Sequence, residues 1–341
     1  MMKSRKNLLL CLILAAGVLA VLYGMLFVGS VPIAGGEVRQ ILAGLVTGKK
    51  PDNGNLYNLI VYVRMPRLVL NLLAGAILSI AGILMQTLTH NPLAEPYVLG
   101  VSSGASTGAA GAIVFHWFSF LHGGRVFFSA FVFSFIAIAL VLLLQGRSTS
   151  SLRLVLTGMG VSAFFQAATT LIVYLSRDEA QARSAQFWIT GSFSGSDWSD
   201  VRMAAAAAAV LLLFARIFEK ELDLLLLGKN TAAQTGLNVA AVQITVIAFA
   251  SFAVSVIVAQ SGIVGFVGLI IPHIMRRLAG AGHRWLIRSS ALAGALFLIV
   301  ADTIARTAFA PQELPIGVMT AFTGAPVFLF IIHRAYHEDR S

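Results

Sequence analysis

Few residues of this sequence are spaced as catalytic or metal-binding groups are spaced. Ser102 lies in a G-x-S-x-G match, the pattern of a hydrolase nucleophile, but its flanks are apolar and helix-compatible, without a strand or a base. The seven histidines form no H-E-x-x-H pair, the single cysteine excludes an intrachain disulfide, and no phosphate-binding G-x-x-x-x-G-K-[ST] motif occurs. The sequence therefore predicts no catalytic residue, metal site or cofactor in this chain.

Polar side chains within apolar stretches are a stronger functional signal, because a charge at the bilayer centre costs about 2.5–3.5 kcal/mol. Asp302 ends an apolar run four residues before Arg306. The two are expected to form an ion pair on one helix face, in which Asp302 could also orient Arg306 outward. Four further polar residues either hydrogen-bond between helices or line a wet pathway, namely Gln86, Asn91, Gln166 and Gln260.

Arg64 and Arg67 flank Met65-Pro66, and Pro66 suits the first turn of a helix. One interpretation is that these arginines extend toward lipid headgroups. The other is that they form a docking surface for an acidic extracellular protein, because guanidinium groups pair well with carboxylates.

The composition excludes most soluble proteins. Of 341 residues, 58% are hydrophobic and only 11% are charged, whereas about 25% of a soluble domain is charged. The net charge of +10 does not indicate nucleic-acid binding, because the basic residues are scattered at the ends of apolar runs.

Apolar stretches near the ~20 residues that cross a bilayer recur along the whole chain. We predict an all-α membrane protein with a single domain, 1–341, and ten spans. They are 8–28, 68–89, 97–118, 126–145, 152–175, 201–218, 240–260, 263–280, 289–306 and 316–334. The loops divide the 24 Lys and Arg residues into sets of 14 and 10. The richer set includes both termini, which are therefore expected in the cytoplasm.

Small residues recur at helical spacing within these spans. Gly75, Ser79 and Gly82 share one face, and Gly104 and Gly108 share another. This spacing predicts close packing between helices.

The cytoplasmic segment 219–238 is too charged to cross a membrane, yet it is compatible with a helix that stops at Gly236. It is either a helix that docks on a soluble partner or an ordinary surface loop.

Taken together, these motifs resemble the permease subunits of ABC importers for ferric siderophores, haem and cobalamin. The matching residues are Arg64-Met65-Pro66-Arg67, Gly75 through Gln86, Asn91 through Pro96, Leu99 through Gly104, Leu227-Gly228 with Ala232, Gly236 and Leu237, Gly262, Phe266-Val267-Gly268-Leu269, Pro272-His273, Arg276, Asp302 with Arg306, Glu313 through Gly317, and Gly324-Ala325-Pro326.

The resemblance implies a ten-helix subunit in the bacterial cytoplasmic membrane that pairs with a second copy or a close relative. It also implies two cytoplasmic ATPase subunits, which bind ATP and Mg, and a periplasmic or lipoprotein binding protein. No nucleic acid is expected among the partners.

By position, Arg64, Arg67 and Arg306 resemble the arginines that receive acidic residues of the binding protein. The residues that resemble the ATPase-coupling segment are Gly228, Thr231, Ala232, Gly236 and Leu237. The candidates for the pathway or for helix packing are Gln86, Asn91, Gly104 and Asp302. Lys229 and Thr235 depart from the family pattern, in which an acidic residue and a leucine are common at these positions.

The expected function is ATP-driven import of a ferric siderophore or a similar chelate by alternating access. The alternatives are a haem or cobalamin permease and an ion-coupled secondary transporter. A secondary transporter should carry buried charges for its coupling ions, and Asp302 is almost the only candidate.

Overall fold

The computed structural model describes residues 2–29, 33–48, 54–121 and 123–338, and all regular structure within these ranges is helical. Lys49, Lys50 and Arg340, which contribute to the loop charge counts, lie outside the described residues. The ten predicted spans coincide with α1 (Met2–Met25), α4 (Met65–Thr89), α5 (Val101–Val114), α6 (Arg125–Gln145), α7 (Ser151–Tyr174), α9 (Trp198–Ile217), α12 (Val239–Ser261), α13 (Val267–Ala279), α14 (His283–Thr307) and α15 (Ile316–Glu338). The predicted fold class is confirmed.

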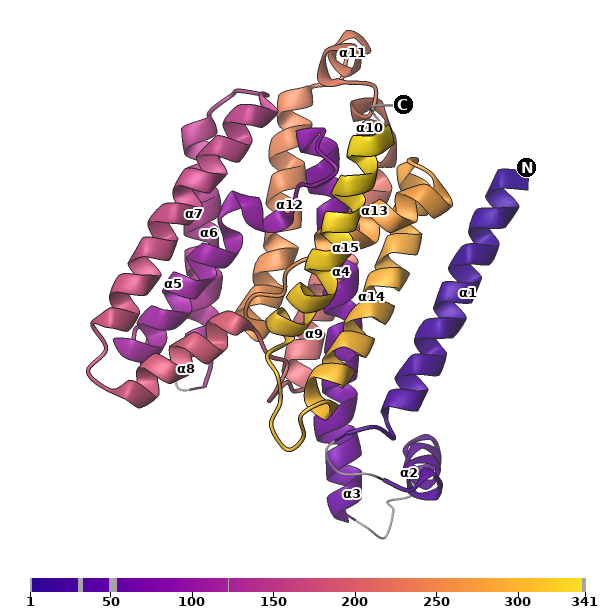
Figure 1. Ribbon diagram of the computed structural model, residues 1–341, viewed down its shortest axis with the longest axis vertical. Helices are drawn as coiled ribbons and strands as arrows, with labels where there is room; N and C mark the ends of the chain where they lie inside the picture. The colour runs from indigo at the N-terminus through magenta and orange to yellow at the C-terminus, as the bar shows by residue number, and fades with distance from the viewer. Residues whose placement is uncertain (1, 30–32, 49–53, 122, 339–341) are drawn as a thin grey trace.

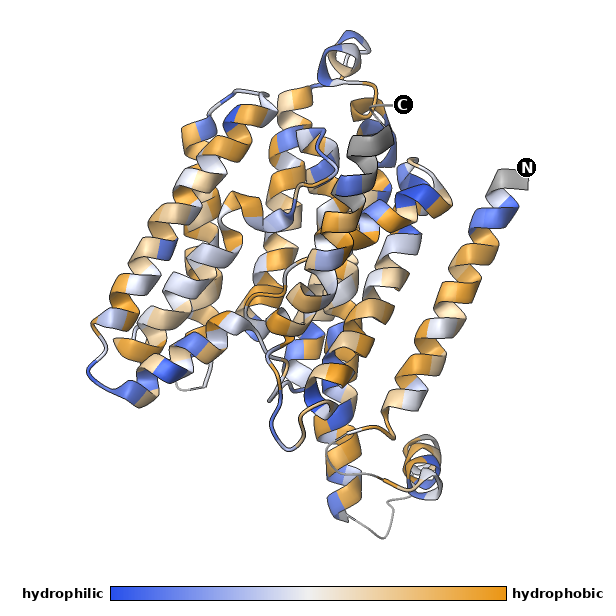
Figure 2. Cartoon of the chain, in the orientation of Figure 1, coloured by the Kyte–Doolittle hydropathy of each residue, from blue (hydrophilic) through white to orange (hydrophobic). Residues whose placement is uncertain are grey.

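Shorter helices cap the two ends of the bundle. The end that carries α10 (Glu219–Leu225) and α11 (Lys229–Gln234) is called the α11 end, and it also holds the start of α1 and the end of α15 (Figure 1). The opposite end, which carries α2 (Gly35–Thr47) and α3 (Gly54–Asn58), is called the α3 end. The helix α8 (Glu179–Thr190) lies obliquely on the same side as the α3 end. Figure 2 shows that apolar residues cover the long helices between these two ends.

Six helices within the described residues are long and apolar enough to cross a membrane, or seven if the bent pair α9–α10 forms one span. The helices α5 and α13 have only 14 and 13 residues. At 1.5 Å per residue each is about 20 Å long, which is less than the ~30 Å of the hydrocarbon core. The continuous spans predicted at 97–118 and 263–280 are therefore each a short helix preceded by a different backbone conformation.

Left-handed backbone conformations explain where these two helices begin. A short 3-10 helix, η2 (Pro96–Leu99), precedes α5 and ends at Gly100, whose φ is 81°. Before α13, Gly262 has a φ of 69° and Phe266 a φ of 68°. The exposed backbone groups find partners inside the protein, because Tyr97 Oη donates to the Val264 carbonyl (3.0 Å) and Phe266 N–H to Glu95 Oε1 (2.9 Å). Non-helical backbone is tolerated in a membrane only when it is satisfied in this way.

The helix α4 runs through the centre of the bundle, and its glycines permit two close crossings. A Cβ atom on Gly75 would lie 2.1 Å from the Gly294 carbonyl oxygen of α14, and one on Gly82 would lie 1.9 Å from the Gly268 carbonyl oxygen of α13. As predicted from the spacing of small residues, the backbones of these helices touch directly.

The helices α5 and α6 cross in the same way. A Cβ atom on Gly104 would lie 2.5 Å from the Phe133 carbonyl oxygen, and one on Gly108 would lie 2.3 Å from that of Ser129. The absence of a side chain at Gly104 therefore permits the close contact between α5 and α6.

Candidate docking and coupling sites

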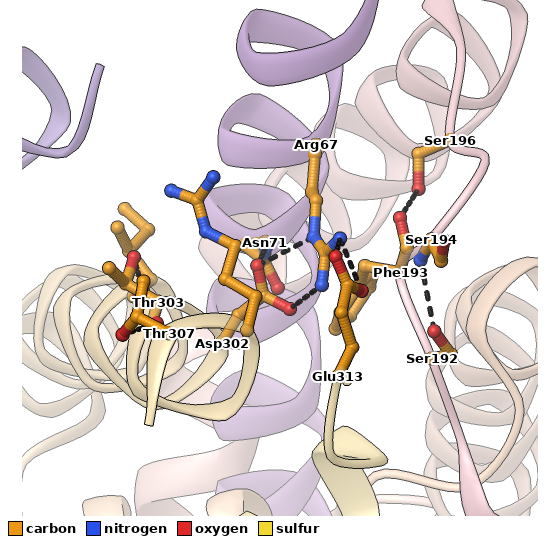
Figure 3. Close-up of polar contacts among 12 residues, drawn as sticks. Arg67, Asn71, Ser192, Phe193, Ser194, Ser196, Asp302, Thr303, Thr307 and Glu313 are labelled. Carbon is orange, nitrogen blue, oxygen red and sulfur yellow. Dashed lines mark hydrogen bonds and ion pairs between the residues drawn. The ribbon is translucent and has the colours of Figure 1, made fainter. Parts of the chain in front are cut away.

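A buried ion cluster ties α4 to α14 at the α3 end (Figure 3). Arg67 on α4 donates from Nε and Nη2 to the two carboxylate oxygens of Asp302 on α14, at 2.9 Å each. Its Nη1 donates to Glu313, which follows α14, at 2.9 and 3.2 Å. Asn71, one turn further along α4, donates to Asp302 at 2.9 Å. Arg67 thus has two carboxylate partners, and the side chain of Asp302 is only 1% exposed.

The predicted ion pair between Asp302 and Arg306 is wrong. Both carboxylate oxygens of Asp302 face α4 and accept hydrogen bonds from Arg67 and Asn71. The bidentate geometry with Arg67 satisfies a buried carboxylate better than a single bond along one helix face would. Arg306 instead donates from Nη2 to the Met25 carbonyl at 3.3 Å.

The three arginines assigned to docking share one small cavity at the α3 end. Arg64, Arg67 and Arg306 line a space of about 100 Å³ together with Glu313. Arg64 donates from Nη1 to the Leu26 carbonyl at 2.6 Å. The three arginines are only 4%, 8% and 5% exposed in the isolated chain. Their role in docking stays a prediction.

At the α11 end, the segment 219–238, called the coupling segment after its predicted role, forms two short helices separated by Gly228, whose φ of 99° requires a glycine. Thr231 and Gly236 are exposed, Gly228 and Leu237 are half-buried, and Ala232 is fully buried. The segment ends on a compact turn in which Leu237 N–H donates to the Ala232 carbonyl at 3.3 Å. It therefore presents an ordered surface away from the bundle.

Two polar contacts attach α10 to the rest of the protein. Asp223 accepts hydrogen bonds from the backbone N–H of His283 at 2.9 Å and from its ring Nδ1 at 2.7 Å. These bonds hold the pKa of the Asp223 carboxyl below its usual value. The other ring nitrogen of His283 lies 2.9 Å from Thr87 Oγ1 on α4. His90, which follows α4, contacts the Leu225 carbonyl at 2.8 Å.

Within the described residues, a single side chain, Lys229, makes the hydrogen bonds that attach α11 to the neighbouring helices. The ammonium group of Lys229 donates to the Thr149 carbonyl, to Ser151 Oγ at 2.9 Å and to Gln243 Oε1 at 3.5 Å. The coupling segment therefore contacts α4, α7, α12 and α14 through named side chains.

The remaining candidates, Gln86 and Asn91, both make hydrogen bonds within the protein. Gln86 donates from Nε2 to the carbonyl oxygens of Gly268 and Leu269 at 3.3 Å, so it joins α4 to α13. Asn91 is exposed, and its side chain accepts the N–H of Leu93 at 2.9 Å in the turn after α4. No group of three or more His, Cys, Asp or Glu residues in the described ranges could hold a metal ion.

Sequence reasoning missed Asn71, His283 and the partners of Lys229, and it noted Glu313 only as part of the family motif 313–317. Asn71 could have been found, since it lies on the same face of α4 as Arg67, one turn away. No local pattern could indicate the others, because their partners are distant in sequence.

Comparison with known proteins places this arrangement in a class. A solved structure described as an inward-facing conformation of a metal-chelate type ABC transporter matches with a TM-score of 0.81 and 31% identity, over 95% of this chain and 98% of that one. The fold is thus that of a permease subunit of a type II ABC importer, which hydrolyses no ATP itself.

The FecCD transport family model matches residues 12–334, and the chain belongs to this family of permeases for iron chelates, haem and cobalamin. The hemin transport permease HmuU of Yersinia pestis is 35% identical over 85% of this chain and 87% of its own length. The Fe(3+) dicitrate permease FecD of Escherichia coli is 36% identical over 85% and 89%. The vitamin B12 permease BtuC of Citrobacter koseri is 38% identical over 79% and 81%. Permeases of this class assemble with ATPases and a binding protein.

Proposed function

We propose that this chain, as one permease domain over residues 1–341, imports a ferric siderophore or a similar iron chelate across the bacterial cytoplasmic membrane. The observation that carries the choice of cargo is that two relatives of 35% and 36% identity are named for hemin and Fe(3+) dicitrate. The BtuC relative supports cobalamin as the alternative. The α11 end, which holds the start of α1 and the end of α15, then faces the cytoplasm, and the α3 end faces outward.

The buried ion cluster argues against an ion-coupled secondary transporter. Such a carrier needs a charged group that exchanges its counter-ion during the cycle. Asp302 is held by Arg67 and Asn71 on both oxygens and is 1% exposed. It is a structural anion, so ATP hydrolysis by a partner is the better source of energy.

One side of α7 is exposed in the isolated chain and is called its free face. This face supports pairing with a second permease copy around the pathway. Phe164, Leu171 and Tyr174 are 66%, 57% and 84% exposed. Gln166 and Thr170 are exposed among them, near the middle and the end of the helix. An amide facing lipid at mid-membrane is unfavourable, so this face is better suited to a second subunit and a wet pathway. On α15, Phe322 and Leu329 expose a second apolar surface.

The import function is tested by reconstituting the chain with its ATPase and binding protein in proteoliposomes. Radioactive ferric siderophore is expected to enter only with ATP and the binding protein, and haem and cobalamin are tested in parallel. Uptake that survives without ATP and disappears when the ion gradient is collapsed would contradict the proposal. ATP-driven uptake of cobalamin alone would contradict only the cargo.

Removing the charges of Arg64 and Arg306 is expected to weaken binding-protein docking by about tenfold or more, because each buried charge–carboxylate contact contributes about 1.5–3 kcal/mol. The double variant R64Q/R306Q is compared with R177Q, which removes an exposed arginine between α7 and α8. Affinity is measured by biolayer interferometry on nanodiscs, and thermal unfolding verifies that each variant is folded.

The control R177Q is expected to change affinity less than about twofold, since an exposed charge is hydrated and screened. A folded double variant with unchanged affinity would remove both arginines from the docking surface. That result would leave the uptake experiment unaffected.

A further inference from the structure

Lys229 occupies a position that local electrostatics disfavours. It is the first residue of α11, and its ammonium contacts Ser151, the first residue of α7. The N-terminus of a helix carries partial positive charge, so a cation is unfavourable at both places. Partial burial also lowers the pKa of its ammonium group. A charged residue at a position where local electrostatics is unfavourable is expected to have a functional role.

Hydrogen bonds offset this cost. An ammonium group has three donors, and Lys229 has three oxygen acceptors, from Thr149, Ser151 and Gln243. The Ser151 hydroxyl donates its one hydrogen to the Leu88 carbonyl of α4 at 3.2 Å, so it accepts from Lys229. The ammonium therefore joins α11 to the start of α7, to α12 and, through Ser151, to the end of α4.

The loop that receives this contact is itself braced. Gln145, the last residue of α6, donates from Nε2 to the Ser148 carbonyl at 2.9 Å. Ser150 caps α7 by accepting the N–H of Arg153 at 3.3 Å. A displacement of Lys229 would thus move the start of α7 as a unit.

No other side chain of α11 hydrogen-bonds to α7 or to the loop 146–150 within the described parts of the chain. The contacts of α10 are with other helices. Asp223 bonds to His283 at the start of α14, and the Leu225 carbonyl bonds to His90 at the end of α4. Within the described residues, the contact of Lys229 with Ser151 is the one direct side-chain hydrogen bond between the coupling segment and α7, the helix whose free face carries Gln166.

We propose that Lys229 is a positioning residue that passes the displacement of the coupling segment to the start of α7 and so couples ATP hydrolysis to opening of the pathway. The proposal rests on the proposed function, because it requires an ATPase that moves α10 and α11. The contact depends on the lysine at position 229, where the family pattern commonly has an acidic residue.

The test uses the complete transporter in proteoliposomes, with K229M, which keeps the length of the side chain and removes its donors. K229M is expected to assemble and hydrolyse ATP, while cargo uptake per ATP falls by about tenfold, as expected for loss of a charge-assisted contact. K229R, which retains donors, should restore most of the coupling. The exposed Arg177, which lies outside the segment 219–238, supplies the control R177M, which should behave as wild type.

A second measurement reports the contact without transport. Spin labels at the exposed positions Arg147 and Gln234, in a C11S background, are expected to give one narrow distance in the permease alone and a broader distribution in K229M. Unchanged coupling together with an unchanged distribution would overturn the proposal. If K229M fails to assemble, the label experiment on the permease alone decides. A wild-type transporter without ATP-driven uptake would instead refute the proposed function.

Discussion

Replacing Asp302 with alanine is expected to lower the free energy of unfolding by about 3–5 kcal/mol, because the change leaves part of a buried guanidinium unpaired. Arg67 loses two of its hydrogen bonds, each 2.9 Å long, and keeps only those to Glu313. Asn71 also loses its acceptor. Unfolding is followed by circular dichroism in mixed micelles as the fraction of denaturing detergent is raised.

Two controls separate this effect from ordinary loss of packing. The double variant R67M/D302L removes both charges, and replacing a buried ion pair by apolar side chains of similar volume is often neutral or stabilising. It is therefore expected to recover part of the stability, because Asn71 still lacks its acceptor and Glu313 loses its contact with Arg67. E179A removes the ion pair between Glu179 and Arg183, whose side chains are 89% and 77% exposed, respectively. This variant should cause no measurable change in stability. A double variant as unstable as D302A would show that the pair is not the source of the loss.

The second large effect is expected at the crossing of α4 and α13. In G82A the new methyl group would lie 1.9 Å from the Gly268 carbonyl oxygen and 2.7 Å from its Cα, so the helices must separate. Backbone atoms cannot rotate away as a side chain can. We expect a loss of about 3 kcal/mol, at the upper end of the usual cost of overpacking.

The matched control is G160A on α7, where no atom lies within 4 Å of the added methyl group. Alanine is the better helix former by about 1 kcal/mol, so this variant should be neutral or slightly more stable. The two variants are compared by thermal unfolding in the same detergent. Equal stability of G82A and wild type would mean that α4 and α13 do not pack as closely as described.

Much of the fold follows from local composition. Each span was predicted from its own apolar residues, and the ten helices coincide with those predictions. The same reasoning failed at α5 and α13, which the sequence presented as continuous spans. Their starts depend on Glu95 and Tyr97 meeting Phe266 and Val264, residues about 170 positions apart whose pairing no local pattern records.

The candidate sites divide in the same way. Motif resemblance assigned Arg67 to docking. Helical spacing assigned Asp302 the wrong partner, Arg306, because four residues along a helix is the only proximity a sequence displays. The true partner is 235 positions away. Lys229 was recognised as a departure from the family pattern, whereas its three acceptors became visible only in the folded chain.

The sequence by itself thus determined that this protein is a ten-helix membrane permease and which of its positions resemble docking and coupling sites. Hydropathy and motif spacing are properties of contiguous residues, so they can be read from the sequence without knowing how the helices pack. The tertiary structure alone decided which polar groups satisfy one another. A buried charge or a broken helix must find its partners wherever the packed helices bring them, and in this bundle they come from distant parts of the chain.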